Sequence, residues 1–256
     1  MEQTHSKFNI KHLLIIILIL IIILAVVLSI TQFTLSKEYE PPTAAADILP
    51  RYRSLDLDHI AISGLDPEWV EAAKKIVAGA KKQVDIQARN IMLLPEEPNY
   101  YQGGDPPQDI AMSTDIIARA YGHAGFDLRE LVHQDIVSAF DQYPLRQLWG
   151  QRYADPNIDY RRIQNMEVFF NRNAEALTTD FNPSNKRNLD QWLPGNVVFF
   201  DMSRDGFTDN VGIISDNTTR AGIPKVIYNY SFPGHTCEEN ILGQEKVTGH
   251  YRYHPR

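Results

Sequence analysis

The longest apolar stretch of the chain lies near its N-terminus. Residues 13–30 are 18 successive positions with a single polar side chain, Ser29. As an α-helix this run would be roughly 27 Å long, which is close to the ~30 Å hydrocarbon core of a bilayer. The pattern therefore predicts a transmembrane anchor over residues 13–30, with the lipid bilayer as its partner.

The charges on either side of this run predict its orientation. Lys7 and Lys11 precede it, whereas Lys37 follows it beside two glutamates. Basic residues favour the cytoplasmic side of a membrane, so we expect residues 1–12 in the cytoplasm and the rest of the chain outside. Cleavage of the run as a signal peptide is the alternative, although Ser29-Ile30-Thr31 is a poor cleavage site.

A linker and then the helical first half of a domain follow the apolar run. Residues 31–65 contain Pro41, Pro42 and Pro50 and little apolar periodicity, which is typical of an extracytoplasmic linker. A domain over residues 66–256 then begins with Asp66-Pro67, a capping pattern that precedes apolar residues at helical spacing. Helices are predicted over residues 66–84, from Ser113 onward, over 128–140 and over 165–173.

The second half of the domain has the pattern of strands. Short β-branched and aromatic runs at 197–201, 211–215 and 226–230 are separated by Asp205-Gly206 and Ala221-Gly222 turns. We expect these runs to form an antiparallel meander, to which residues 247–253 add a strand. Helices followed by strands predict an α+β domain.

Composition narrows the possible functions. The 25 Lys and Arg residues are outnumbered by 32 Asp and Glu, which gives a net charge of −7 and disfavours nucleic acid as a partner. The single Cys237 allows neither an internal disulfide nor a cysteine-rich zinc site. Phosphate-binding glycine motifs and a His-Glu-x-x-His motif are also missing from the sequence, so we predict no cofactor and no metal.

Several motifs, taken in order, resemble the DUF1287 family, which looks related to the NlpC-type papain-like cysteine peptidases and amidases of bacterial cell envelopes. The matching segments are Gly103-Gly104-Asp105-Pro106-Pro107, Ser113 to Ala120, Leu131-Val132-His133, Asn157 to Arg162, Asn165, Val211 to Asp216, Val226 to Asn229 and Thr248 to Tyr253. The resemblance implies a papain-like fold for residues 70 to 254.

The resemblance also implies three catalytic positions, and all three are substituted here. The family has a cysteine at the start of a helix where this chain has Ser113. Its histidine position on the following strand matches Asn210, and its second histidine position, on the next strand, matches Tyr228. Tyr160 likewise stands where the family often has histidine. A helix N-terminus lowers a thiol pKa toward neutrality, but a dipole worth at most ~2 kcal/mol does not ionise an alcohol, and a neutral amide does not accept its proton.

Two alternatives remain open for Ser113. It is also an ordinary helix N-cap residue, which would give it a structural role. In the other alternative a histidine from elsewhere serves as a relocated base, and Ser113 then acts as the nucleophile of an active hydrolase. The candidates are His133, His235, His250 and His254.

A group of charged residues supplies candidate ligand-binding positions. Arg161 and Arg162 follow Asp159, and we expect one arginine to pair inward with Asp115 or Asp159. The other arginine would bind a peptide carboxylate or brace the loop over the cleft. Cys237 follows His235 in a predicted loop and is interpreted as a bystander near solvent.

These observations lead to a hypothesis of a single-pass cell-membrane protein. Its extracytoplasmic papain-like domain would be a pseudoenzyme of the cysteine peptidase or amidase type that binds a peptidoglycan peptide or an envelope protein. The alternatives are an active cell-wall hydrolase that uses Ser113, and a docking module in an envelope complex.

Overall fold

The computed structural model describes residues 65–91 and 105–255. The predicted cytoplasmic segment, the membrane anchor and all of the linker except Leu65 lie outside these ranges. Within the described ranges, no helix is both long enough and apolar enough to cross a bilayer.

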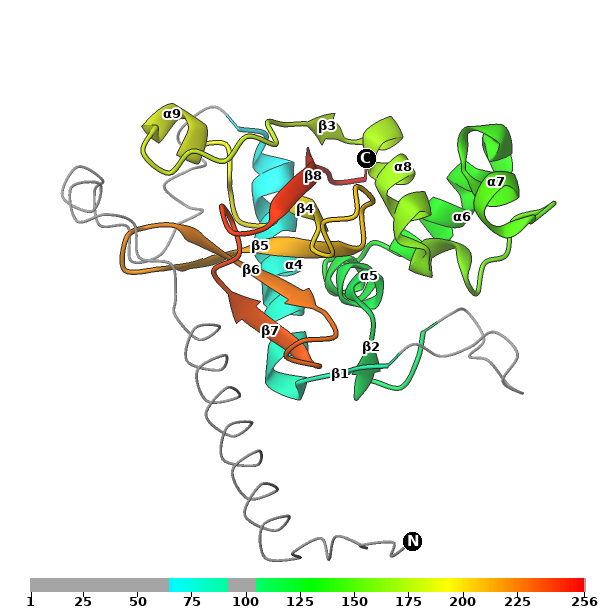
Figure 1. Cartoon of the computed structure of the whole chain (residues 1–256), viewed down its shortest axis with the longest axis horizontal. Helices are drawn as coiled ribbons and strands as arrows, with labels where there is room; N and C mark the ends of the chain where they lie inside the picture. Colours follow the sequence, from blue (N-terminus) through cyan, green and yellow to red (C-terminus); the bar gives the residue numbers. More distant parts are fainter. Residues whose placement is uncertain (1–64, 92–104, 256) are drawn as a thin grey trace, which may run out of the picture. The chain divides into compact units, whose positions relative to one another are not determined.

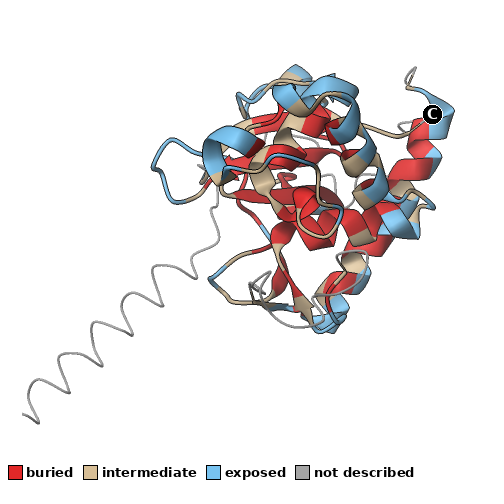
Figure 2. Cartoon of the chain, turned by 90° about the vertical axis from the view of Figure 1, so that its right-hand side faces the viewer, coloured by how far each residue is buried: buried red, intermediate tan, exposed pale blue. Residues whose placement is uncertain are grey.

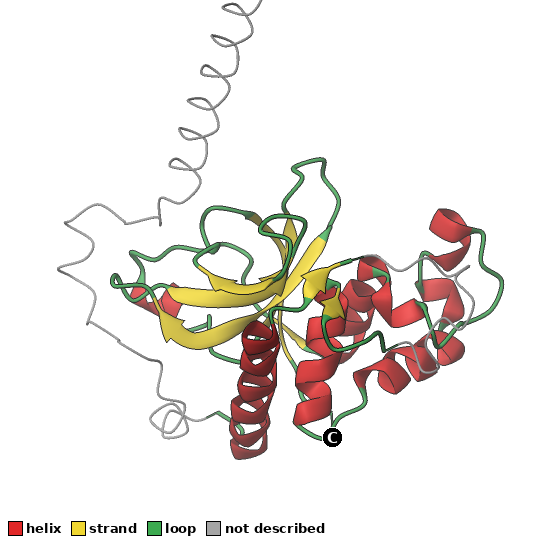
Figure 3. Cartoon of the chain, turned by 90° about the horizontal axis from the view of Figure 1, so that it is seen from below, coloured by secondary structure: helices red, strands yellow, loops and turns green. Residues whose placement is uncertain are grey.

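The described chain is an α+β domain in which the longer helices lie on one face of an antiparallel sheet (Figures 1 and 3). The helices are α4 (Pro67–Ile86), α5 (Ser113–His123), α6 (Leu128–Ser138), α7 (Leu145–Trp149), α8 (Ile163–Asn173) and α9 (Lys186–Leu189), with 3₁₀ turns η3 (Phe140–Gln142) and η4 (Asp159–Arg161). The strands are β1 (Arg89–Asn90), β2 (Ile110–Ala111), β3 (Glu175–Ala176), β4 (Val197–Asp201), β5 (Asn210–Thr218), β6 (Pro224–Asn229), β7 (Thr236–Glu239) and β8 (Lys246–Arg252).

The helix predicted over residues 66–84 is α4. The Asp66 side chain accepts a hydrogen bond of 2.9 Å from the Glu68 N–H, and Pro67 occupies the first turn, as the sequence predicts. Its buried face includes Trp69, Ile76 and Ala80, which recur at helical spacing. The apolar period therefore determined which side of α4 packs inward.

Six of the strands form a sheet in the order β3-β8-β4-β5-β6-β7, and β1 and β2 form a separate parallel pair. β4 to β7 follow one another as an antiparallel meander, and β8 returns to pair with β4. The predicted meander is thus confirmed, and so is the strand that closes it. Helices α4 and α5 pack against β5 and β6.

The two faces of the sheet contribute to two different apolar clusters. Figure 2 shows that the buried residues are concentrated in the strands and in the helices that cover them. Side chains alternate along a strand, so Val211 and Ile213 of β5 join the helices in one cluster, whereas Ile214 joins the cluster on the other face. Gly212 allows β5 and β6 to approach closely, because a Cβ at this position would lie 2.5 Å from Val226 Cγ1. The close approach of the two strands explains why a glycine stands between Val211 and Ile213.

Candidate functional site

Ser113 is the first residue of α5 and lies at the junction between β2 and the helix. Its exposed fraction is 7%. The N-cap is Met112, and the side chain that binds the free N–H there is Asp115, whose Oδ2 accepts from Met112 N at 2.8 Å. Ser113 is therefore not the capping residue, and its Oγ makes no hydrogen bond with any residue that the structure describes.

Asp115, in the same first turn of α5 as Ser113, is the centre of a buried polar network. Its carboxylate accepts hydrogen bonds of 2.8 Å from Tyr160 Oη and 2.8 Å from Arg161 Nη2. Asp115 is completely buried, and the Arg161 side chain is 2% exposed. Burial raises the pKa of Tyr160 well above its usual value, and the neighbouring Asp115 charge adds to this shift. The phenol therefore remains a proton donor to Asp115.

The predicted inward pairing of one arginine is confirmed, and that arginine is Arg161. The Thr114 hydroxyl also donates to the Arg161 carbonyl oxygen at 3.4 Å, so this ion pair ties the first turn of α5 to η4. Because Asp115 and Arg161 neutralise each other in the interior, they are better suited to holding the helix start in place than to meeting a ligand.

Asp159 is also turned inward. Its carboxylate accepts hydrogen bonds from the Asp155 N–H and from Gln151 Nε2, the latter at 3.0 Å. Burial raises the pKa of Asp159. Its backbone carbonyl accepts from Asn165 Nδ2 at 3.1 Å, which links η4 to α8.

Arg162 differs from the other three predicted ligand-binding residues because part of its side chain, 19%, remains exposed. Its guanidinium lies 4.3 Å from the centre of the Trp149 ring, and its Nη1 contacts Gln151 and, at 3.9 Å, Asp159. Among the described residues only Nη1 has polar partners, so Nε and Nη2 remain available to a ligand.

Asn210 and Tyr228 lie on neighbouring strands, two residues out of register, because Tyr228 pairs with Gly212. Asn210 Nδ2 contacts Met202 Sδ at 2.8 Å, and Tyr228 Oη donates to Glu239 at 3.0 Å. Both side chains alternate with residues of the helix-side cluster and so point to the opposite face of the sheet. The structure thus places these two positions on the same face of neighbouring strands, each with its own partner, while Ser113 lies on the helix side and no hydrogen bond joins it to either.

The histidines considered as relocated bases have other surroundings. His250 is buried between Asn196 Nδ2 at 3.0 Å and the Thr178 carbonyl at 2.8 Å, and His254 faces Asp66. His235 forms a β-bridge with Arg89, and His133 belongs to α6. Of the four, and of His123 as well, none is hydrogen-bonded to Ser113.

Two expectations about Cys237 are wrong. It lies in strand β7 rather than in a loop, and it is buried rather than near solvent. Burial raises the pKa of its thiol to about 12. The thiol is therefore protonated at neutral pH, which does not suit a nucleophile.

Trp149 and Gln151 are site residues that the sequence did not indicate. They position Arg162 from 11 and 13 residues away along the chain, without helical or strand periodicity between them. The only sequence signal for these two residues was an aromatic and an amide a short distance before Arg161 and Arg162. Without the fold, this signal does not show that they contact Arg162.

The fold and this site define an α+β domain with a buried, ion-paired helix start and a serine at its first position. A family model described as "Domain of unknown function (DUF1287)" matches residues 77–253, so the chain belongs to this family. The "Uncharacterized protein YijF" of Escherichia coli (strain K12) is 35% identical over 153 residues, which cover 60% of this chain and 69% of that protein. No solved structure matches the chain.

Proposed function

We propose that this protein is a membrane-anchored component of the cell envelope whose domain, of the NlpC-type papain-like class, binds a peptidoglycan peptide without cleaving it. The observation that carries the proposal is the isolation of the Ser113 hydroxyl: the described residues offer it no hydrogen-bonded proton acceptor. An alcohol needs such a base to attack a peptide carbonyl.

The packing of α5 on an antiparallel sheet, with Ser113 at the start of the helix, supports the papain-like part of this proposal. The surroundings of Ser113 support the loss of catalysis. Asn210 and Tyr228 already have partners on the far face of the sheet, and a neutral amide is too weak a base for this step. The apolar run at residues 13–30 supports the membrane anchor.

Arg162 is the group that we assign to the ligand. A partly exposed guanidinium held over an aromatic ring is pre-organised to bind a peptide carboxylate through two parallel N–H groups. The buried Asp115–Arg161 pair would hold η4, and with it Arg162, in position.

A binding experiment tests this assignment. Soluble muropeptides are titrated calorimetrically into the purified full-length protein, into Arg162→Gln and into Arg187→Gln, a control at an exposed arginine of α9. Loss of a charge-assisted contact predicts roughly tenfold weaker binding for Arg162→Gln and no change for the control. Absence of binding to the unmodified protein would refute peptide recognition and favour the docking module, whereas equal binding by both variants would remove Arg162 from the site.

A further inference from the structure

A pocket of about 650 Å³ lies at the start of α4. It is lined by Asp66 and Trp69 from the beginning of that helix, by Glu175 of β3, and by Arg252 and His254 at the end of the domain. Ser113 lies beyond the opposite end of α4, because β1 and β2 connect that end to the start of α5. Because α4 has 20 residues, its ends are about 30 Å apart, and this pocket is separate from the site described above.

Three nitrogen atoms of the pocket walls are buried without a hydrogen-bond partner. One is Nε2 of His254, and the other two are donors: Nε1 of Trp69, a residue that is 1% exposed, and Nε of Arg252. The Arg252 guanidinium lies 5.0 Å from the Trp69 ring centre, so the two donors are close together. Both atoms can only donate hydrogen bonds, and a buried donor is costly to leave unsatisfied. A ligand of this pocket should therefore present an acceptor to them.

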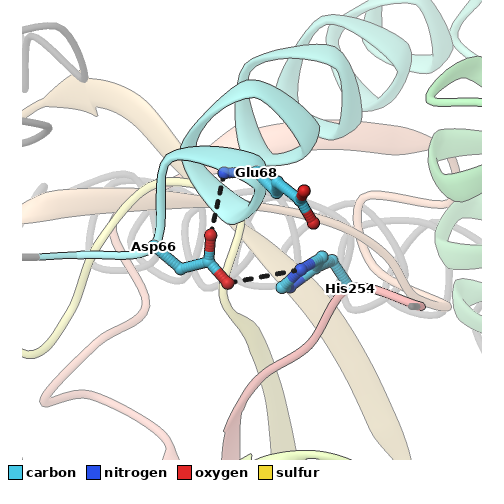
Figure 4. A group of neighbouring side chains, drawn as sticks. All are labelled: Asp66, Glu68 and His254. Carbon is cyan, nitrogen blue, oxygen red and sulfur yellow. Dashed lines mark hydrogen bonds and ion pairs between the residues drawn. The ribbon is translucent and has the colours of Figure 1, made fainter.

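The same pocket also contains acceptors. Glu175 accepts from Arg252 Nη1 at 3.2 Å and is largely exposed, and Asp66 has 40% of its side chain exposed. His254 Nε2 lies 3.7 Å from Asp66 Oδ2, too far for a hydrogen bond, and Figure 4 shows these side chains grouped with Glu68 at the helix start. A ligand that satisfies the donors thus lies beside carboxylates.

This mixture of groups limits the chemistry of the ligand. A bare cation would leave the N–H groups of Trp69 and Arg252 unsatisfied, and a multiply charged anion such as phosphate would be repelled by Asp66 and Glu175. A zwitterion avoids both problems, because its carboxylate accepts from the donors while its ammonium group donates to the carboxylates.

We propose that this pocket binds a zwitterionic amino-acid group, with the carboxylate on Trp69 Nε1 and Arg252 Nε and the ammonium on Asp66 and Glu175. The group could come from a free amino acid or from a short peptide. The pocket volume lies within the range usual for small-molecule sites.

The three tryptophans provide the readout. Full-length protein labelled with ¹⁵N-tryptophan gives indole signals from Trp69, Trp149 and Trp192, of which Trp192 already donates to Asn188 at 3.3 Å. L-alanine is expected to shift the Trp69 signal saturably and to leave the other two unchanged. N-acetyl-L-alanine and L-alaninamide, which each lack one charge, should bind at least roughly tenfold more weakly. Tighter binding of L-alanyl-L-alanine would support the proposal with a peptide as the source.

Two variants test the donors, and calorimetry measures their affinity for L-alanine. Trp69→Phe keeps an aromatic ring but removes the indole N–H, and Arg252→Lys keeps the charge but removes Nε; each should weaken binding roughly tenfold. Arg89→Lys, at an exposed ion pair with Asp109, should not. If circular dichroism shows that Trp69→Phe is unfolded, Arg252→Lys decides. No saturable shift with L-alanine or L-alanyl-L-alanine, equal binding of N-acetyl-L-alanine, or unchanged affinity in the folded variants would overturn the proposal.

Discussion

Asp115→Asn is expected to lower the free energy of unfolding by about 3 to 5 kcal/mol, because it leaves the Arg161 guanidinium buried without its counter-charge. The Arg161 side chain is 2% exposed, so water cannot replace the lost carboxylate. Urea unfolding followed by circular dichroism measures this change.

Two controls show whether burial is the cause. Asp190→Asn breaks the exposed Lys186–Asp190 pair of α9 and should cost less than about 1 kcal/mol. The double variant Asp115→Leu with Arg161→Met removes both buried charges and should be more stable than Asp115→Asn alone. A loss below about 1 kcal/mol for Asp115→Asn would show that this pair does not hold the start of α5.

The second large effect is a pH dependence that originates at His250. Burial lowers the pKa of His250 to about 4, whereas a histidine in an unfolded chain titrates near 6.5. Between these values the unfolded chain binds the proton and the folded chain does not, so stability from this group is fully present above pH 6.5 and is lost as the pH falls toward 4. Its share of the unfolding free energy should decrease by about 2 kcal/mol between pH 7.5 and pH 5.

Comparison with His250→Gln isolates this contribution, because all other titrating groups are common to both proteins. The variant should lose about 2 kcal/mol less than the unmodified protein when urea unfolding is repeated at the two pH values. Equal losses in the two proteins would mean that His250 is protonated in the folded state or is not buried.

The main elements of the fold could be predicted because their signals are local. The cap at Asp66 and the apolar period after it determine α4, and β-branched runs determine β4, β5 and β6. Strand β7 was missed because Thr236 to Glu239 is short, ends in two glutamates and has no apolar alternation. Its pairing with β6 makes it a strand, and that is not a property of its own sequence.

The site was predictable in part for the same reason. Ser113 at the start of a helix follows from the residues around it, but the capping role belongs to Asp115, which reaches back to Met112. The side-chain direction of Asn210 could have been predicted from the sequence. Val211 and Ile213 are apolar and point toward the helices, so Asn210, which alternates with them, points to the other face of the sheet. The partners of Arg162 and His250 come from distant segments, and only the assembled fold shows them.

Turnover of soluble muropeptides by the purified full-length protein, compared with Ser113→Ala, tests most directly whether the Ser113 hydroxyl lacks a base. We expect no cleavage products from either protein above the buffer background, with unchanged far-ultraviolet circular dichroism in the variant. Cleavage by the unmodified protein that disappears in Ser113→Ala would contradict this expectation and would establish a serine hydrolase with a relocated base.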